Sequence, residues 1–241
     1  MDTPQRTPHA DDDHRGATSR RLFVLAGAAA FLTGCASTST KVASGLPGPW
    51  WTTPTLPPPR PEPVKPATPA PTGVVARSSW AKGNPVPTRM DSARRTTRIT
   101  VHHDGMKPFT DTGWSAAANR LESIRRAHLR RKPQRFGDIG YHYAIDPAGR
   151  VWACRPLAYQ GAHVAGQNHG NLGIVVLGNY DKQSINRAQQ AALVAFLAAQ
   201  RRQYGIGVDR IHTHKEMAAT ACPGESLQRF MVAVRRNGSI A

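Results

Sequence analysis

Three short segments of this 241-residue chain carry residues that could do chemistry together: one of His102 and His103, then Tyr141, and then His214 followed by Cys222. Two imidazoles and a thiolate are the usual protein ligands of a zinc ion that keeps its fourth position open for catalysis. A phenol within reach could donate a hydrogen bond to a reacting oxygen. These residue types point to a catalytic zinc site, provided that the fold brings them together.

The first histidine segment follows a pattern typical of a β-strand. Residues 98–103 alternate in polarity and are rich in β-branched side chains, so they predict a strand that ends in His102 and His103. Successive side chains of a strand point to opposite faces, so His103 points away from His102. Spacing alone leaves open which of the two is the ligand.

The thiol follows a second histidine segment. Residues 210–214 predict a short strand in which His212 and His214 share one face. Cys222 lies in the loop after this strand, and Pro223-Gly224 turns the chain into the next helix. A strand end and the loop that follows it can bring His214 and Cys222 together.

The other elements alternate between helices and strands. The expected segments are a helix over 114–132, a hairpin over 139–154 with its turn at 146–149, a buried strand over 172–178, a helix over 184–204 and a final helix over 225–236. Ser184 is the expected N-cap of the second helix, and Gly205 its end. This order predicts an α/β domain whose central mixed β-sheet is flanked by helices on both faces.

The N-terminus has the features of an export address. Residues 1–35 contain Arg20-Arg21 and then an apolar run too short to span a bilayer, and they end in Leu32-Thr33-Gly34-Cys35. Paired arginines resemble a twin-arginine signal, and the last four residues resemble a lipobox whose Cys35 becomes lipidated. We expect a disordered leader and a lipid-anchored protein of the cell envelope that faces the periplasm, or a secreted one. An ordinary secretory signal with an incidental cysteine is the alternative.

Residues 36–72 are expected to be a proline-rich linker, because 46–72 alone hold 11 of the 20 prolines. The remaining span, 73–241, is long enough to bury the core of one domain. There, Lys and Arg outnumber Asp and Glu by 25 to 10, which favours anionic partners, but no signature of specific nucleic-acid binding accompanies them. We expect a monomer in which Cys154 is a small buried hydrophobe.

Five motifs occur in an order that resembles one family. They are Val101-His102-His103, Asp138-Ile139-Gly140-Tyr141-His142, Gly161 to Asn168, Leu172-Gly173-Ile174, and His214 with Thr220-Ala221-Cys222-Pro223-Gly224. This arrangement, from about Val75 to the C-terminus, resembles the zinc-dependent N-acetylmuramoyl-L-alanine amidases. That superfamily is shared by bacterial and phage type 2 amidases and by animal peptidoglycan recognition proteins.

The resemblance implies a role for each matched position. It implies Zn²⁺ as the cofactor, with His102, His214 and Cys222 as its ligands, and Tyr141 and Thr220 as catalytic residues. His103 matches a frequent neighbour of the first ligand, and His103, His163 and Asn168 are assigned to substrate binding. The implied reaction is cleavage of the amide between N-acetylmuramic acid and L-alanine in peptidoglycan or muropeptides, by metal-activated water. The alternative is a non-hydrolytic peptidoglycan-binding module, which typically lacks the cysteine.

Two departures from the family pattern bear on the mechanism. Some bacterial members carry a glutamate base on the strand that corresponds to 173–178, and this chain has no carboxylate there. Glu216, two residues after His214, is a candidate base, although a glutamate at such a position is more often a supporting partner or a solvated strand end. Asp104 replaces a common Ser or Thr after the paired histidines. A zinc peptidase acting within the stem peptide would need an added base.

Overall fold

The computed structural model describes residues 73–240. The predicted export signal over 1–35, with the predicted lipidation site Cys35, and the predicted linker over 36–72 lie outside the described residues. Within 73–240, no helix is both long enough and apolar enough to cross a membrane.

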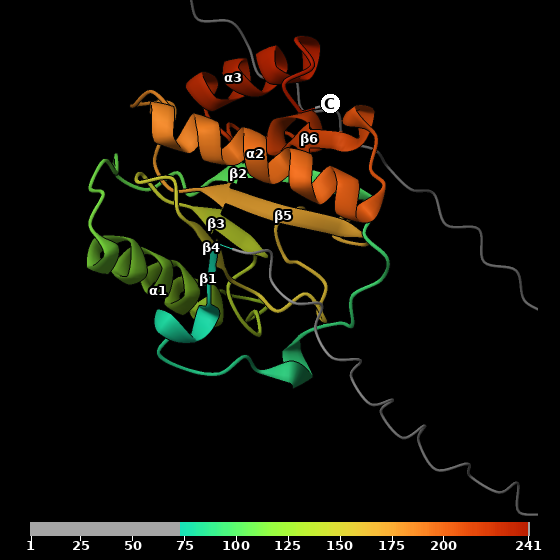
Figure 1. The fold of residues 1–241 in the computed structure, drawn as a ribbon. Helices are drawn as coiled ribbons and strands as arrows, with labels where there is room; N and C mark the ends of the chain where they lie inside the picture. The colour runs from blue at the N-terminus through green and yellow to red at the C-terminus, as the bar shows by residue number, and fades with distance from the viewer. Residues whose placement is uncertain (1–72, 241) are drawn as a thin grey trace, which may run out of the picture. The chain divides into compact units, whose positions relative to one another are not determined.

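Six strands form one mixed sheet in the order β1-β4-β3-β5-β2-β6 (Figure 1). The strands are β1 (Val74–Val75), β2 (Arg98–His103), β3 (Tyr143–Ile145), β4 (Val151–Ala153), β5 (Asn171–Val176) and β6 (Ile211–Thr213). β3 and β4 are antiparallel, and the other neighbouring pairs are parallel. Both neighbours of β2 therefore end at the same edge of the sheet as its histidines.

Helices cover both faces of this sheet, as predicted (Figure 1). The helices are α1 (Trp114–Arg130), α2 (Arg187–Tyr204) and α3 (Glu225–Arg236), with short 3₁₀ turns at Arg77–Ser79, Pro87–Arg89, Val208–Arg210 and His214–Glu216. Ile99 and Val101 of β2 point into the core beneath α2 and α3. On the opposite face, Leu121 of α1 packs with Trp152 and Val175. His102 alternates with Val101 and so points to the α1 face.

Most expected elements are confirmed, but several of their ends differ from the prediction: α1 ends at Arg130 in place of 132, and β5 ends at Val176 in place of 178. α2 begins at Arg187, and its N-cap is Asn186 in place of the expected Ser184, because Asn186 Oδ1 accepts the N–H of Gln189 at 2.8 Å. The end of the helix at Gly205 is confirmed: this glycine adopts φ of 65°, a left-handed conformation that closes the last turn.

Candidate metal centre

His102 and His214 lie side by side because their strands are neighbours. β2 and β6 run parallel with Val101 opposite Thr213, so the next residue of each segment lies at the same edge and on the same face. The two ring centroids are 4.6 Å apart. The register of the sheet thus joins two histidines that are far apart in sequence, whereas His212 lies two pairs back, opposite Thr100.

Cys222 completes a cluster with these two histidines. Its Sγ lies 3.6 Å from His102 Nδ1, and the candidate ligand atoms of His102, His214 and Cys222 all lie within 4.8 Å of one another. Thr220 Oγ1 accepts the N–H of Cys222 at 3.2 Å. Thr220 therefore holds the loop that presents the sulfur.

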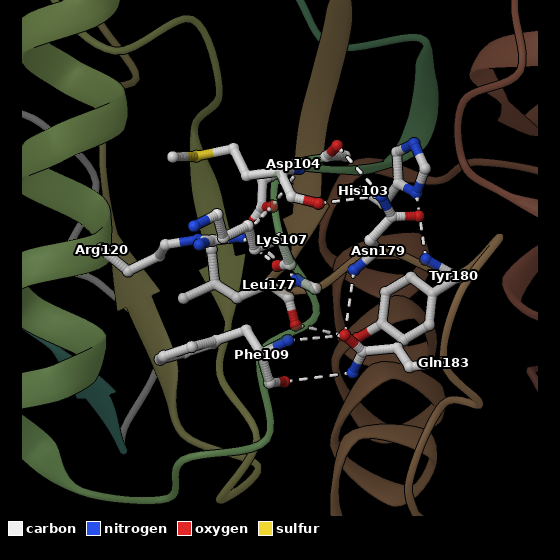
Figure 2. A network of polar contacts seen from close by, with 12 residues as sticks. His103, Asp104, Lys107, Phe109, Arg120, Leu177, Asn179, Tyr180 and Gln183 are labelled. Carbon is white, nitrogen blue, oxygen red and sulfur yellow. Dashed lines mark hydrogen bonds and ion pairs between the residues drawn. The ribbon is translucent and has the colours of Figure 1, made fainter.

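His103 lies on the other face of β2 and supports the same loop from behind. Its Nδ1 accepts the N–H of Tyr180 at 3.3 Å (Figure 2). Gly224 packs against both residues: its φ is 85°, and a Cβ there would approach the carbonyl carbon of Tyr180 to 2.6 Å and His103 Nδ1 to 3.0 Å. His103 is buried and does not line the groove beside His214. This placement gives no support to its predicted substrate contact.

Asp104 joins the loops that follow β2 and β5. Its buried carboxylate accepts two hydrogen bonds from the Arg120 guanidinium of α1, at 2.7 and 3.1 Å, and one from the N–H of Gly178 at 3.1 Å. Asn179 adds hydrogen bonds to main-chain oxygens of the 104–113 loop (Figure 2). The departure at position 104 thus builds a clamp around the strand ends and adds no ligand to the cluster.

Tyr141 faces the cluster from the segment before β3. Its ring centroid lies 5.2 Å from that of His102. The preceding residue is anchored by α1, because the N–H of Gly140 donates to His128 Nδ1 at 3.0 Å. Burial lowers the pKa of His128 to about 4, so the ring stays a neutral acceptor. This support was not predicted from the sequence, where the available signal was a histidine on the inward face of an expected helix.

Arg155 is a second support that was not predicted from the sequence. Its guanidinium donates to the main-chain oxygens of Ile139, Gln160 and Asp138 at 2.7, 2.7 and 3.2 Å. These bonds tie the segment before Tyr141 to the loop after β4. The only signal in the sequence was a cation directly after an apolar strand.

A groove of about 500 Å³ opens beside the cluster. The groove is lined by His214, His163 and Asn168. Three exposed arginines also line it: Arg89 from the 3₁₀ turn at Pro87–Arg89, and Arg131 and Arg135 from the loop after α1. Asp91 is the acidic residue among the lining residues in the described part of the chain. The groove therefore offers mainly cationic contacts to a molecule bound next to His214.

The structure brings His163 and Asn168 to this groove in different ways. Asn168 Oδ1 accepts the N–H groups of His163 and Val164 at 2.9 and 2.8 Å, so its side chain shapes the loop. The His163 ring is buried and lies 3.0 Å from His102 Nε2 through its own Nδ1. Part of the side chain predicted to bind substrate is thus already engaged with a candidate ligand.

The electrostatics of the cluster suit a metal ion. Burial lowers the pKa of His102 well below 6.5, and the nearby His163 and His214 lower it further. Burial likewise lowers the pKa of His214, so both imidazoles keep a free lone pair at neutral pH. Burial raises the pKa of the Cys222 thiol to about 12, so a thiolate there requires a cation beside it. Two neutral imidazoles and one such sulfur fit zinc.

Glu216 is not placed as a free base. Its carboxylate accepts two hydrogen bonds from Arg235, one from the N–H of Thr213 and one from Gln228. Burial alone would raise the pKa of Glu216, but these hydrogen bonds lower it to about 2. A carboxylate so stabilised is a poor proton acceptor near neutral pH, which favours the supporting role over catalysis.

Comparisons with known proteins identify relatives of this chain. A sequence model of the N-acetylmuramoyl-L-alanine amidase family matches residues 92–225. Peptidoglycan-recognition protein SD of Drosophila simulans is 37% identical over 95 residues, which are 39% of this chain and 51% of that protein. The chain thus spans about half the length of the first curated relatives it matches.

Two further similarities cover more of the matched protein. The endolysin of Escherichia phage T7 is 31% identical over 140 residues, or 56% of this chain and 85% of the endolysin. The crystal structure of Drosophila peptidoglycan recognition protein SD superposes with a TM-score of 0.56 at 26% identity, covering 64% of this chain and 89% of that one.

Proposed function

Since this chain belongs to the N-acetylmuramoyl-L-alanine amidase family, we propose that it is a zinc-dependent peptidoglycan hydrolase. The bond cleaved is the amide between N-acetylmuramic acid and L-alanine of the stem peptide. The observation that carries the proposal is the convergence of His102, His214 and Cys222, whose ligand atoms lie within 4.8 Å of one another. A cluster of three such donors leaves one position of a tetrahedral ion open, as catalytic sites require.

The side chains around the cluster divide the work. Zinc held by the three ligands would polarise the scissile carbonyl and lower the pKa of water from about 15.7 towards 7. Tyr141 donates its hydroxyl hydrogen to the oxyanion that develops on the substrate. Burial raises the pKa of Tyr141 above its ordinary value, which keeps that hydrogen in place at neutral pH. Thr220 holds Cys222 through its main-chain N–H.

The groove supports a peptidoglycan substrate. Stem peptides carry carboxylates, and Arg89, Arg131 and Arg135 line the groove with positive charge next to His214. Asn168 shapes the wall of the same groove through His163 and Val164. We therefore place the stem peptide along this wall and the muramic lactyl group at the cluster.

The proposed location is the cell envelope, where peptidoglycan lies. It is supported by the export features of residues 1–35, including the paired arginines and the lipobox-like ending at Cys35. A lipid on Cys35 would anchor the protein to a membrane, and the proline-rich linker over 36–72 would separate the domain from it. The protein acts as a monomer in this proposal.

The test compares metal-free and zinc-reloaded protein on purified sacculi. Zinc-reloaded protein should release stem peptides with a free L-alanine amine and leave glycan strands with a free lactyl carboxylate, as identified by mass spectrometry. Cys222→Ser should lose zinc and this release, because one of three ligands is gone. Cys154→Ala removes the other cysteine of the domain, which is buried away from the cluster, and should retain both. Full zinc stoichiometry in Cys222→Ser would contradict the ligand assignment.

A non-hydrolytic peptidoglycan-binding protein is the second candidate, and its support is the similarity to peptidoglycan-recognition proteins. The same experiment separates the two. Protein that co-sediments with sacculi and holds zinc, yet releases no new amine or carboxylate, would establish the binding module.

A further inference from the structure

His163 makes two ring hydrogen bonds, and together they define its protonation. Its Nε2 lies 3.1 Å from the carbonyl oxygen of Asn171, which can only accept, so Nε2 carries the hydrogen. In a neutral imidazole the other nitrogen, Nδ1, then holds a lone pair. That Nδ1 lies 3.0 Å from His102 Nε2 and must accept from it.

The tautomer of His102 follows from that of His163. Because its Nε2 donates to His163, its Nδ1 is the nitrogen with the free lone pair. That nitrogen lies 3.6 Å from Cys222 Sγ, on the side of the three-residue cluster. The orientation of one main-chain carbonyl, at Asn171, thus determines which atom His102 presents to a metal.

The fold gives the His163 ring a fitted space. Two glycines border it: a Cβ at Gly173 would meet its Cδ2 at 2.4 Å, and a Cβ at Gly161 would meet the same atom at 2.5 Å. Neither contact is tolerable for a real side chain, so both positions must lack one. Asn168 fixes the main chain of His163 at the same time. The ring is therefore held in one place by β5 and by its own loop.

We infer that His163 is a positioning residue of the metal centre, which keeps His102 in the tautomer and orientation that present Nδ1 to zinc. This inference rests on the proposed zinc site, and it replaces the substrate contact predicted for His163. Partners of this kind, one step out from the metal, typically change metal affinity by about 10- to 100-fold when they are removed.

The test measures zinc affinity of the full-length protein by competition with a chromogenic chelator. His163→Leu fills the space but cannot accept, and it should weaken zinc binding by about 10- to 100-fold. His163→Asn can place Oδ1 near the position of Nδ1 and should recover most of that loss. His142→Leu is the matched control: His142 is also buried, bonds to the main chain of Tyr159 and Gly173, and lies edge-on to the His163 ring at 6.0 Å between centroids, but it makes no hydrogen bond to His102. It should keep wild-type zinc affinity.

A second measurement does not depend on the variants or on zinc. Long-range ¹H–¹⁵N spectra of the zinc-free wild type, with labelled histidine, should show His102 and His163 both protonated at Nε2. Protonation of His102 at Nδ1, or a His163→Leu protein with wild-type zinc affinity and only a raised KM, would overturn the inference. A folded wild type that binds no zinc would instead refute the proposed function, while the spectra would still report the tautomers.

Discussion

At the scale of single residues, Tyr141 is proposed to take part in catalysis but not in zinc binding. Its hydroxyl is the proposed hydrogen-bond donor to the developing oxyanion, and Tyr141 is not one of the proposed zinc ligands. Tyr141→Phe should therefore keep full zinc content and lose about 10²- to 10³-fold in kcat, the usual effect of removing one such donor. The measurement is turnover of a soluble muramyl peptide, with zinc determined on the same sample.

Tyr143 provides the control for this variant. It lies two residues later, points to the other face of the sheet and packs on Phe196 of α2, with ring centroids 4.8 Å apart. Tyr143→Phe should keep its turnover. If Tyr141→Phe also turned over at the wild-type rate, the oxyanion role would have to pass to another group.

At the scale of elements, Glu122 of α1 forms a buried ion pair within its own helix and also holds the segment before β2. Glu122 and Arg125 lie 2.7 Å apart, and the N–H of Lys82 also donates to Glu122. Burial alone would raise the pKa of Glu122, but the hydrogen bonds from Arg125 and Lys82 lower it below 4.5. Because the folded-state pKa is the lower one, this stabilisation is complete above about pH 4.5 and is lost as the pH falls.

Glu122→Gln should therefore lower the free energy of unfolding at neutral pH by about 1.5–3 kcal/mol, the usual worth of hydrogen bonds to a charged group. It should also lose less stability than the wild type when the pH is taken below 4.5. Urea unfolding at both pH values measures this. Glu225 forms an exposed pair with Arg229, so Glu225→Gln should change neither the free energy of unfolding at neutral pH nor the stability lost in acid. Equal acid sensitivity in Glu122→Gln and the wild type would assign the acid loss to other carboxylates.

Some helix and strand boundaries were predictable from the sequence, and others were not. The strand at 98–103 and the helix at 225–236 were predictable because their periodicity is strong and their ends carry clear signals. The start of α2 was not, since Ser184 and Asn186 are both good caps and only the path of the chain brings Asn186 Oδ1 to Gln189.

The site divides in the same way. The order of motifs was enough to choose His102 and His214 over their neighbours, and the structure brings these two together with Cys222. The role proposed for His163 could not be predicted from the sequence, because it depends on the direction of the Asn171 carbonyl across a loop. The support from His128 likewise depends on where a helix packs.

At the scale of the whole molecule, we propose that the leader directs the domain to the cell envelope, where its substrate lies. If Cys35 carries the lipid, Cys35→Ser should move the protein from the membrane fraction to the soluble fraction without changing its zinc content. Immunoblots of fractionated cells measure the first quantity and metal analysis of the purified protein the second. A Cys35→Ser protein that stayed wholly with the membranes would remove the lipoprotein proposal and leave the site intact.

The central claim is hydrolysis at one amide bond, and digestion in H₂¹⁸O tests it most directly. The zinc-loaded protein is incubated with a muramyl peptide in labelled water, and the products are weighed by mass spectrometry. We expect one ¹⁸O in the lactyl carboxylate of the muramic acid and an unlabelled stem peptide with a free L-alanine amine. Label in a carboxylate within the stem peptide, or an intact substrate beside fully zinc-loaded protein, would contradict it.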